Sequence, residues 1–88
     1  MAKNLFVGSL PFSVTEGALS QLFAQFGQVI SAKIISDRYS GQSRGFGFVE
    51  MSTDEEALKA IEKLNNYNLE GRNIVAIYNP LKKKTIYL

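Results

Sequence analysis

Eight consecutive residues, 44–51, place two aromatic rings and a positive charge at a spacing that suits one β-strand. Successive side chains of a strand point to opposite faces. One face then carries Arg44, Phe46, Phe48 and Glu50. The opposite face carries Gly45, Gly47, Val49 and Met51. Because the charged residues share a face with both rings, the rings are predicted to lie on the surface. Flat exposed rings beside a cation suit stacking on nucleobases.

The alternative interpretation places both rings in the core and makes the two glycines bulges. A Phe-Gly-Phe strand taken alone favours that interpretation, because aromatic residues are usually buried. The charged residues at both ends of the aromatic face argue against it. Gly45 and Gly47 are instead predicted on the covered face, where a residue without a side chain would let a helix approach closely.

A second segment, residues 4–8, shows the same pattern. Leu5 and Val7 share one face, whereas Phe6 shares the other with Asn4 and Gly8. Again an aromatic ring lies beside polar or small residues. Two strands of this kind predict one surface that displays three phenylalanines.

Together, residues 5–10 and 44–51 resemble the two signature segments of the RNA recognition motif family. The longer segment is expected as basic-Gly-aromatic-Gly/Ala-Phe-Val-any-aromatic. This chain matches seven of those eight positions and has Met51 where the family has Phe or Tyr. Met51 points toward the core in this pattern, so the departure should change packing rather than binding. The resemblance extends from about Lys3 to Pro80.

The elements between these segments predict an α+β fold. We expect a first helix capped by Thr15 and stopped by Gly27, a strand over 29–36, a helix starting at Ser52 or Thr53, and a last strand over 74–78. The order β-α-β-β-α-β predicts a ferredoxin-like sandwich, with a four-stranded antiparallel sheet and two helices on one face. Residues 3–80 form the predicted domain, and 81–88 a basic C-terminal tail.

The resemblance implies a role for each residue of the bare face. Phe6 and Phe48 would each stack under a base of single-stranded RNA. Phe46 would contact the sugars that join these nucleotides, and Arg44 the phosphate between them. Lys33 on the second strand and Asn79 after the last strand are further RNA-binding candidates, the second as a reader of base edges. Arg38 and Tyr39 lie in a connecting loop that we expect to be mobile, and are weaker candidates.

The composition excludes several classes of function. The chain has 88 residues with neither cysteine nor histidine, so thiolate zinc sites and nucleophile–histidine catalysis are excluded. We predict no enzymatic activity, no metal and no cofactor. The net charge is only +2, with a local net of −2 over residues 53–66. The apolar runs are too short to span a membrane, and a strand predicted almost at the start leaves no room for a signal peptide. We therefore expect a monomeric single-domain protein inside the cell, in the cytoplasm, nucleus or an organelle.

Two rival functions remain on the same fold. A protein-interaction module would use the open sheet or the helices to hold a partner. Relatives of that kind place Arg-any-Phe before the last strand, whereas this chain has Arg72-Asn73-Ile74. A small phosphatase would need an arginine in a phosphate-binding loop after the first strand, and residues 8–15 contain none. Single-stranded DNA remains an alternative to RNA, because stacking tolerates both. The sequence does not identify the preferred bases.

Overall fold

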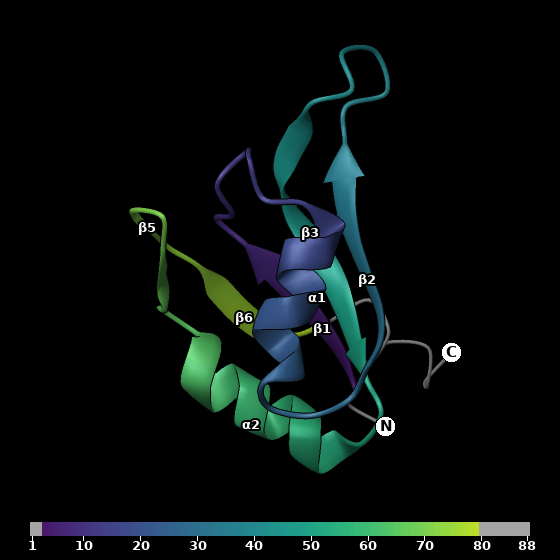
Figure 1. The fold of residues 1–88 in the computed structure, drawn as a ribbon, viewed down its shortest axis with the longest axis vertical. Coiled ribbons are helices and arrows are strands. Elements are labelled where there is room, and N and C mark those ends of the chain that lie inside the picture. Colours follow the sequence, from purple (N-terminus) through teal and green to yellow (C-terminus); the bar gives the residue numbers. More distant parts are fainter. Residues whose placement is uncertain (1–2, 80–88) are drawn as a thin grey trace, which may run out of the picture.

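The computed structural model describes residues 3–79 of the chain. One antiparallel sheet contains four strands in the order β2-β3-β1-β6 (Figure 1). These are β1 (Asn4–Gly8), β2 (Val29–Ser36), β3 (Ser43–Met51) and β6 (Val75–Tyr78). Helix α1 (Glu16–Ala24) follows β1, and helix α2 (Asp54–Leu64) follows β3. The predicted fold is therefore confirmed. Pro80 and the predicted tail over 81–88 lie outside the described residues.

Both helices begin at a threonine cap. The Thr15 side chain accepts a hydrogen bond from the backbone N–H of Ala18 at 3.1 Å, as its position before the apolar stripe predicted. For α2, the sequence allowed two caps. Thr53 is the one used, and its hydroxyl accepts from the backbone N–H of Glu56 at 3.1 Å. Side-chain oxygens of this kind satisfy N–H groups that have no partner within the helix.

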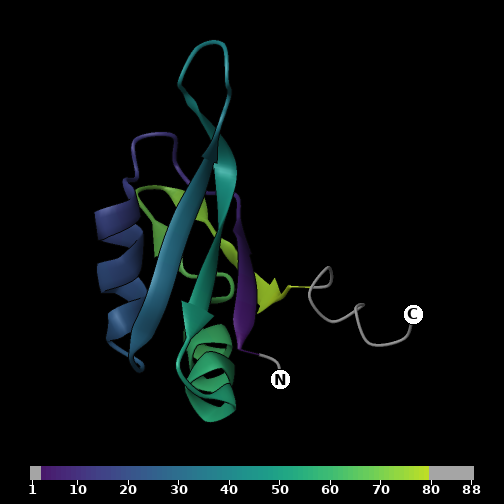
Figure 2. The ribbon, with the colours of Figure 1, turned by 90° about the vertical axis from the view of Figure 1, so that its right-hand side faces the viewer.

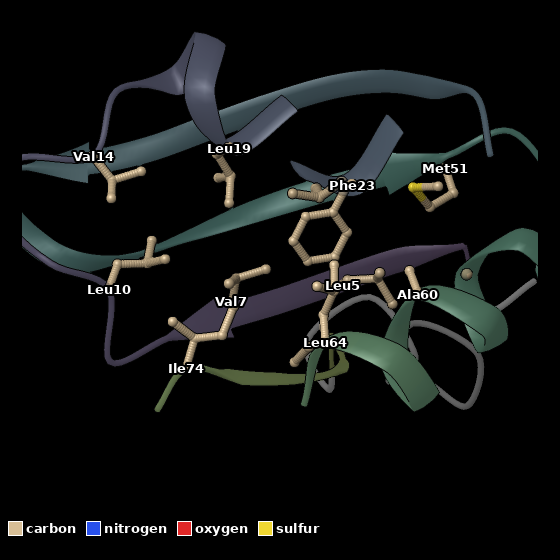
Figure 3. Packing of buried hydrophobic residues seen from close by; sticks show 13 residues of the cluster. Leu5, Val7, Leu10, Val14, Leu19, Phe23, Met51, Ala60, Leu64 and Ile74 are labelled. Carbon is tan, nitrogen blue, oxygen red and sulfur yellow. The ribbon is translucent and has the colours of Figure 1, made fainter. Parts of the chain in front are cut away.

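The core lies between the sheet and the two helices (Figure 3). Leu5 and Val7 of β1 and Met51 of β3 meet Phe23 of α1 and Leu64 of α2 in one buried cluster. Because side chains alternate along each strand, burial of these residues leaves their neighbours on the other face of the sheet. Figure 2, turned by 90°, shows α1 along one side of the sheet.

The two glycines of β3 are buried as predicted, but their neighbours differ from the expectation. A Cβ built on Gly47 would meet the backbone of β2 at Lys33 and Ile34. One built on Gly45 would come within 3.3 Å of the Phe12 ring, in the connection between β1 and α1. The closest atoms at either glycine therefore do not come from a helix. Gly45 also has φ +85°, beside a register shift between β2 and β3. The alternative interpretation had expected bulges at these glycines, and Gly45 agrees with it in this respect. The two rings nevertheless lie on the exposed face, as predicted.

A small hairpin of β4 (Asn68–Leu69) and β5 (Arg72–Asn73) precedes β6, where the sequence had predicted only a turn. The Arg72 guanidinium donates from Nε to the Ser9 carbonyl oxygen at 3.2 Å. The Ser13 hydroxyl donates to a Glu70 carboxylate oxygen at 3.0 Å. The hairpin thus holds the β1–α1 connection through these two contacts.

Candidate nucleic-acid interface

One row of four side chains crosses the whole sheet on the face that the helices leave bare. Phe6 of β1 lies opposite Phe48 of β3 on one side and Ile77 of β6 on the other. Lys33 of β2 lies opposite Phe48. Since residues directly opposite each other in an antiparallel pair share a face, Lys33, Phe48, Phe6 and Ile77 form a continuous row. The predicted positions of all four residues on this face are confirmed by the strand register.

Three phenylalanine rings form a compact cluster on this face. The Phe6 ring centroid lies 5.8 Å from that of Phe46 and 5.8 Å from that of Phe48, and the last two are 6.2 Å apart. The interplanar angle between Phe46 and Phe48 is 87°, an edge-to-face arrangement. An edge-to-face pair of rings contributes about 0.5–1.5 kcal/mol beyond the area that it buries. Each of the three rings keeps part of its surface exposed. The cluster therefore offers fixed, accessible planes to a ligand.

Cationic groups border the rings on two sides. Lys33 is exposed and lies beside Phe48, across the strand pair. Arg44 is exposed on β3, two residues before Phe46. The charge of Arg44 also reaches Asp37, in the β2–β3 connection. The backbone N–H groups of Tyr39 and Ser40 chiefly lower the pKa of the Asp37 carboxyl, and Arg44 lowers it further. The bare face thus presents positive charge at two of its borders.

The β2–β3 connection carries the two weaker candidates. Asp37 accepts hydrogen bonds from the Tyr39 backbone N–H at 2.7 Å and the Ser40 backbone N–H at 3.3 Å. Its own backbone N–H donates to the Gln42 carbonyl oxygen at 2.7 Å. The loop that we expected to be mobile therefore has a defined hydrogen-bonded turn, and its mobility remains a prediction. Tyr39 is 92% exposed.

Asn79 differs from the other predicted RNA-binding residues. It directly follows β6, and its backbone N–H donates to the Asn4 carbonyl oxygen at 2.8 Å. The residue is only 8% exposed. Its position at the border of the bare face agrees with the prediction, but little of its surface is accessible.

A second, polar row runs beside the aromatic one, and Asn79 is the one member of it to which the sequence assigned a function. Glu50 of β3 lies opposite Asn4 of β1 and opposite Ser31 of β2. The register of β1 and β6 continues this row to Asn79. We had used Glu50 only as a marker of the solvent face. The alternation that identified Phe46 and Phe48 also placed Glu50 beside them, and that signal could have found it.

The helix side of the molecule has a shallow hollow of about 440 Å³ where α2 meets the residue Phe26. Its lining includes Glu55, Glu56 and Glu62 as well as Leu58. Within residues 3–79, no cluster of carboxylates could hold a metal ion. The same residues include no helix long and apolar enough to cross a membrane.

Comparison with known proteins agrees with this geometry. The family model described as RNA recognition motif matches residues 5–75. RNA-binding protein CP31B, chloroplastic, of Arabidopsis thaliana is 49% identical over 73 residues, which cover 83% of this chain and 25% of the relative. Small RNA-binding protein 11, chloroplastic, of the same plant is 43% identical over 83 residues, which cover 94% of this chain and 57% of the relative. The chain thus spans well under two thirds of the length of these relatives.

Solved structures of RNA-binding proteins are also similar to this chain. The crystal structure of RNA binding protein PG1 superposes with a TM-score of 0.85 at 43% identity, covering 88% of this chain and 93% of the other. The structure of the Rna15 domain with bound RNA (GU) superposes with a TM-score of 0.82 at 30% identity, covering 90% of this chain and 84% of the other.

Proposed function

The chain belongs to the RNA recognition motif family, a family of RNA-binding domains, and on this premise we propose that it binds single-stranded RNA on the bare face of its sheet. One observation carries the proposal: the rings of Phe6, Phe46 and Phe48 cluster on that face, within 6.2 Å of one another, and remain accessible. Stacking a base on an aromatic ring contributes about 1–3 kcal/mol. The role is binding rather than catalysis.

Two rings serve as stacking platforms in this proposal. One base lies on Phe6 and the next on Phe48, which are directly opposite each other on neighbouring strands. Phe46 lies beside both rings and contacts the sugars that join the two nucleotides. Two stacking contacts alone contribute at most about 6 kcal/mol, which corresponds to a Kd on the order of tens of micromolar. Contacts beyond the rings are therefore needed for tight binding.

The cations supply part of those contacts. Arg44 is exposed on β3, two residues before Phe46, and binds the phosphate between the two nucleotides, since its planar guanidinium can donate two parallel hydrogen bonds. Lys33, beside Phe48, binds a second phosphate or a base. Asn79, directly after β6, reads a base edge with the small part of its surface that is exposed.

The names of the relatives support a setting for this activity. Both plant relatives named above carry the word chloroplastic in their names. We propose that the protein acts as a monomer on RNA inside the cell, in the cytoplasm, the nucleus or an organelle. A protein-interaction role on the same sheet is the alternative, in which the rings hold apolar side chains of a partner instead of bases.

NMR chemical-shift mapping with a pool of short randomised single-stranded RNAs tests the proposal. We expect the largest shifts at the amides around Phe6, Phe46, Phe48 and Lys33, with α2 unaffected. A matched DNA pool reports how far binding depends on the 2′-hydroxyl. Shifts confined to the helices, or none with either pool, would contradict the proposal and favour the protein-interaction role.

A further inference from the structure

Alternate residues of β3 form a line on the bare face. Phe46, Phe48 and Glu50 follow one another along it, and each is partly exposed. Arg44, which is exposed, precedes them across the backbone irregularity at Gly45. Every second residue of a strand is displaced by roughly 7 Å. The line starts at a guanidinium near the β2–β3 connection and ends at a carboxylate near the opposite end of the sheet.

The proposed roles give this line a chemical order. Arg44 binds phosphate, Phe46 contacts sugar and Phe48 stacks under a base. A nucleotide has the same sequence of groups, from phosphate through sugar to the ring of the base. A base that starts at the sugar beside Phe46 and lies over Phe48 must therefore point its outer edge toward Glu50. This step rests on the proposed function.

The surroundings of Glu50 leave its carboxylate available for a base. Its neighbours across the strands are Asn4 and Ser31, both uncharged. Among the described residues, the Glu50 side chain has no hydrogen bond or ion pair. A carboxylate only accepts hydrogen bonds, and its two oxygens can take two parallel donors. A base edge with adjacent donors would satisfy both oxygens.

We infer that Glu50 is a specificity-determining residue that selects guanine at the nucleotide stacked on Phe48. Guanine has two adjacent donors on its Watson–Crick edge, the N1–H and the 2-amino group. Uracil has one N–H between two carbonyl oxygens, and these oxygens face a carboxylate unfavourably. Asn4, beside Glu50, has an amide N–H₂ that suits the remaining guanine acceptor, O6. A well-placed two-bond contact of this type favours the right base by roughly fivefold to a hundredfold.

A competing role for Glu50 is simple repulsion of phosphate. In that case its charge would weaken binding of every RNA equally. The two roles differ in one measurable quantity, the ratio of affinities between RNAs that differ in a single donor group. Inosine provides that difference, because it is guanosine whose base lacks the 2-amino group.

The test uses fluorescence anisotropy with three labelled pentamers, each of uridine except for a central guanine, inosine or uridine. We expect the wild-type protein to bind the guanine pentamer at least about fivefold more tightly than the inosine pentamer, and the uridine pentamer most weakly. Glu50→Gln should reduce the guanine-to-inosine ratio to below about twofold, because the side chain keeps only one acceptor oxygen. Glu55→Gln, on the exposed surface of α2, is the matched control and should keep the wild-type ratio.

A guanine-to-inosine ratio that is unchanged in Glu50→Gln overturns the inference. So does an equal gain in affinity for all three pentamers, which identifies repulsion. In both cases RNA binding persists, so the proposed function stands. If the folded wild-type protein binds none of the pentamers or the randomised pool, the proposed function itself fails and the inference falls with it. Thermal melting of each variant confirms that the proteins compared are folded.

Discussion

The ring of Phe6 lies over Gly8, two residues later in the same strand. A Cβ built on Gly8 would come within 2.8 Å of Cε2 of that ring, closer than such atoms normally approach. The absence of a side chain at position 8 therefore sets the tilt of the Phe6 ring on the bare face. Gly8 itself is buried, although it belongs to the exposed parity of β1.

Gly8→Ala is expected to weaken RNA binding severalfold by displacing the Phe6 ring, while the fold is kept, because Gly8 does not need a positive φ. Isothermal titration with a short RNA and a thermal melt measure the two effects. Gly71→Ala, in the β4–β5 turn, provides a comparison for the cost of replacing a glycine. It should lower stability, because Gly71 has φ +93°, and leave affinity unchanged. Unchanged affinity in Gly8→Ala would mean that the tilt of the Phe6 ring does not matter for binding.

Phe48→Ala should lower RNA affinity strongly and the free energy of unfolding only slightly. Removal of a stacking ring costs about 1–3 kcal/mol of binding free energy, roughly a fivefold to hundredfold loss of affinity. The folded state loses mainly ring contacts with Phe6 and Phe46. That loss is about 1 kcal/mol and lowers Tm by about 4–8 °C in a domain of this size.

Phe23→Ala is the opposite case, because Phe23 is completely buried between α1 and the sheet. Truncation of a core phenylalanine costs about 3–5 kcal/mol of unfolding free energy. Melting curves of the two variants therefore compare the two faces of the sheet directly. A larger drop in Tm for Phe48→Ala than for Phe23→Ala would show that the assigned faces are inverted.

The faces of the sheet could be predicted from sequence because alternation in a strand is a local property. Arg44 and Glu50 have the same parity in the sequence as Phe46 and Phe48. These four residues are enough to predict which face of the strand is exposed to solvent. The bounds of β2, Val29–Ser36, were also predicted, because apolar and polar residues alternate over 30–34 and the polar turn residues from Asp37 onward end the strand.

Features that depend on distant contacts could not be predicted. Ser52 and Thr53 both have a glutamate three residues later, so the sequence allowed either cap. The choice depends on the end of β3: the Ser52 backbone N–H donates to the Gln28 carbonyl oxygen, and the Ser52 hydroxyl donates to Glu56. The β4–β5 hairpin was missed because its turn uses Glu70 at φ +53°, a conformation that glutamate rarely adopts.

Arg44→Gln should change the salt dependence of binding. Each phosphate neutralised on a single strand contributes about −0.7 to the slope of log K against log salt concentration. Loss of the Arg44 contact should therefore make the slope shallower by about 0.7 and weaken binding to all sequences alike. Lys59→Gln, on the exposed surface of α2, removes the same charge from the other side and should leave the slope unchanged. Equal slopes for wild type and Arg44→Gln would exclude Arg44 from the phosphate contact.

Glu56 gives a pH-dependent prediction that concerns stability alone. The Ser52 hydroxyl donates to the Glu56 carboxylate at 2.6 Å and is the main cause that holds the pKa of Glu56 below its ordinary 4.5. The backbone N–H of Gln28 lowers this pKa as well. Because the pKa of the folded state is depressed, the carboxylate stabilises the fold above about pH 4.5, and this stabilisation is lost as pH falls through the lowered value.

Glu56→Gln should therefore lower Tm at pH 7, and the difference from wild type should shrink as pH falls below about 4.5 and through the lowered pKa. RNA affinity at pH 7 should not change, because Glu56 lies on α2, away from the bare face of the sheet. Melting curves at pH 7, 5 and 3.5 measure the Tm difference between Glu56→Gln and wild type at each pH. If the Tm difference for Glu56→Gln is as large at pH 3.5 as at pH 7, the carboxylate charge is not what joins α2 to the α1–β2 connection.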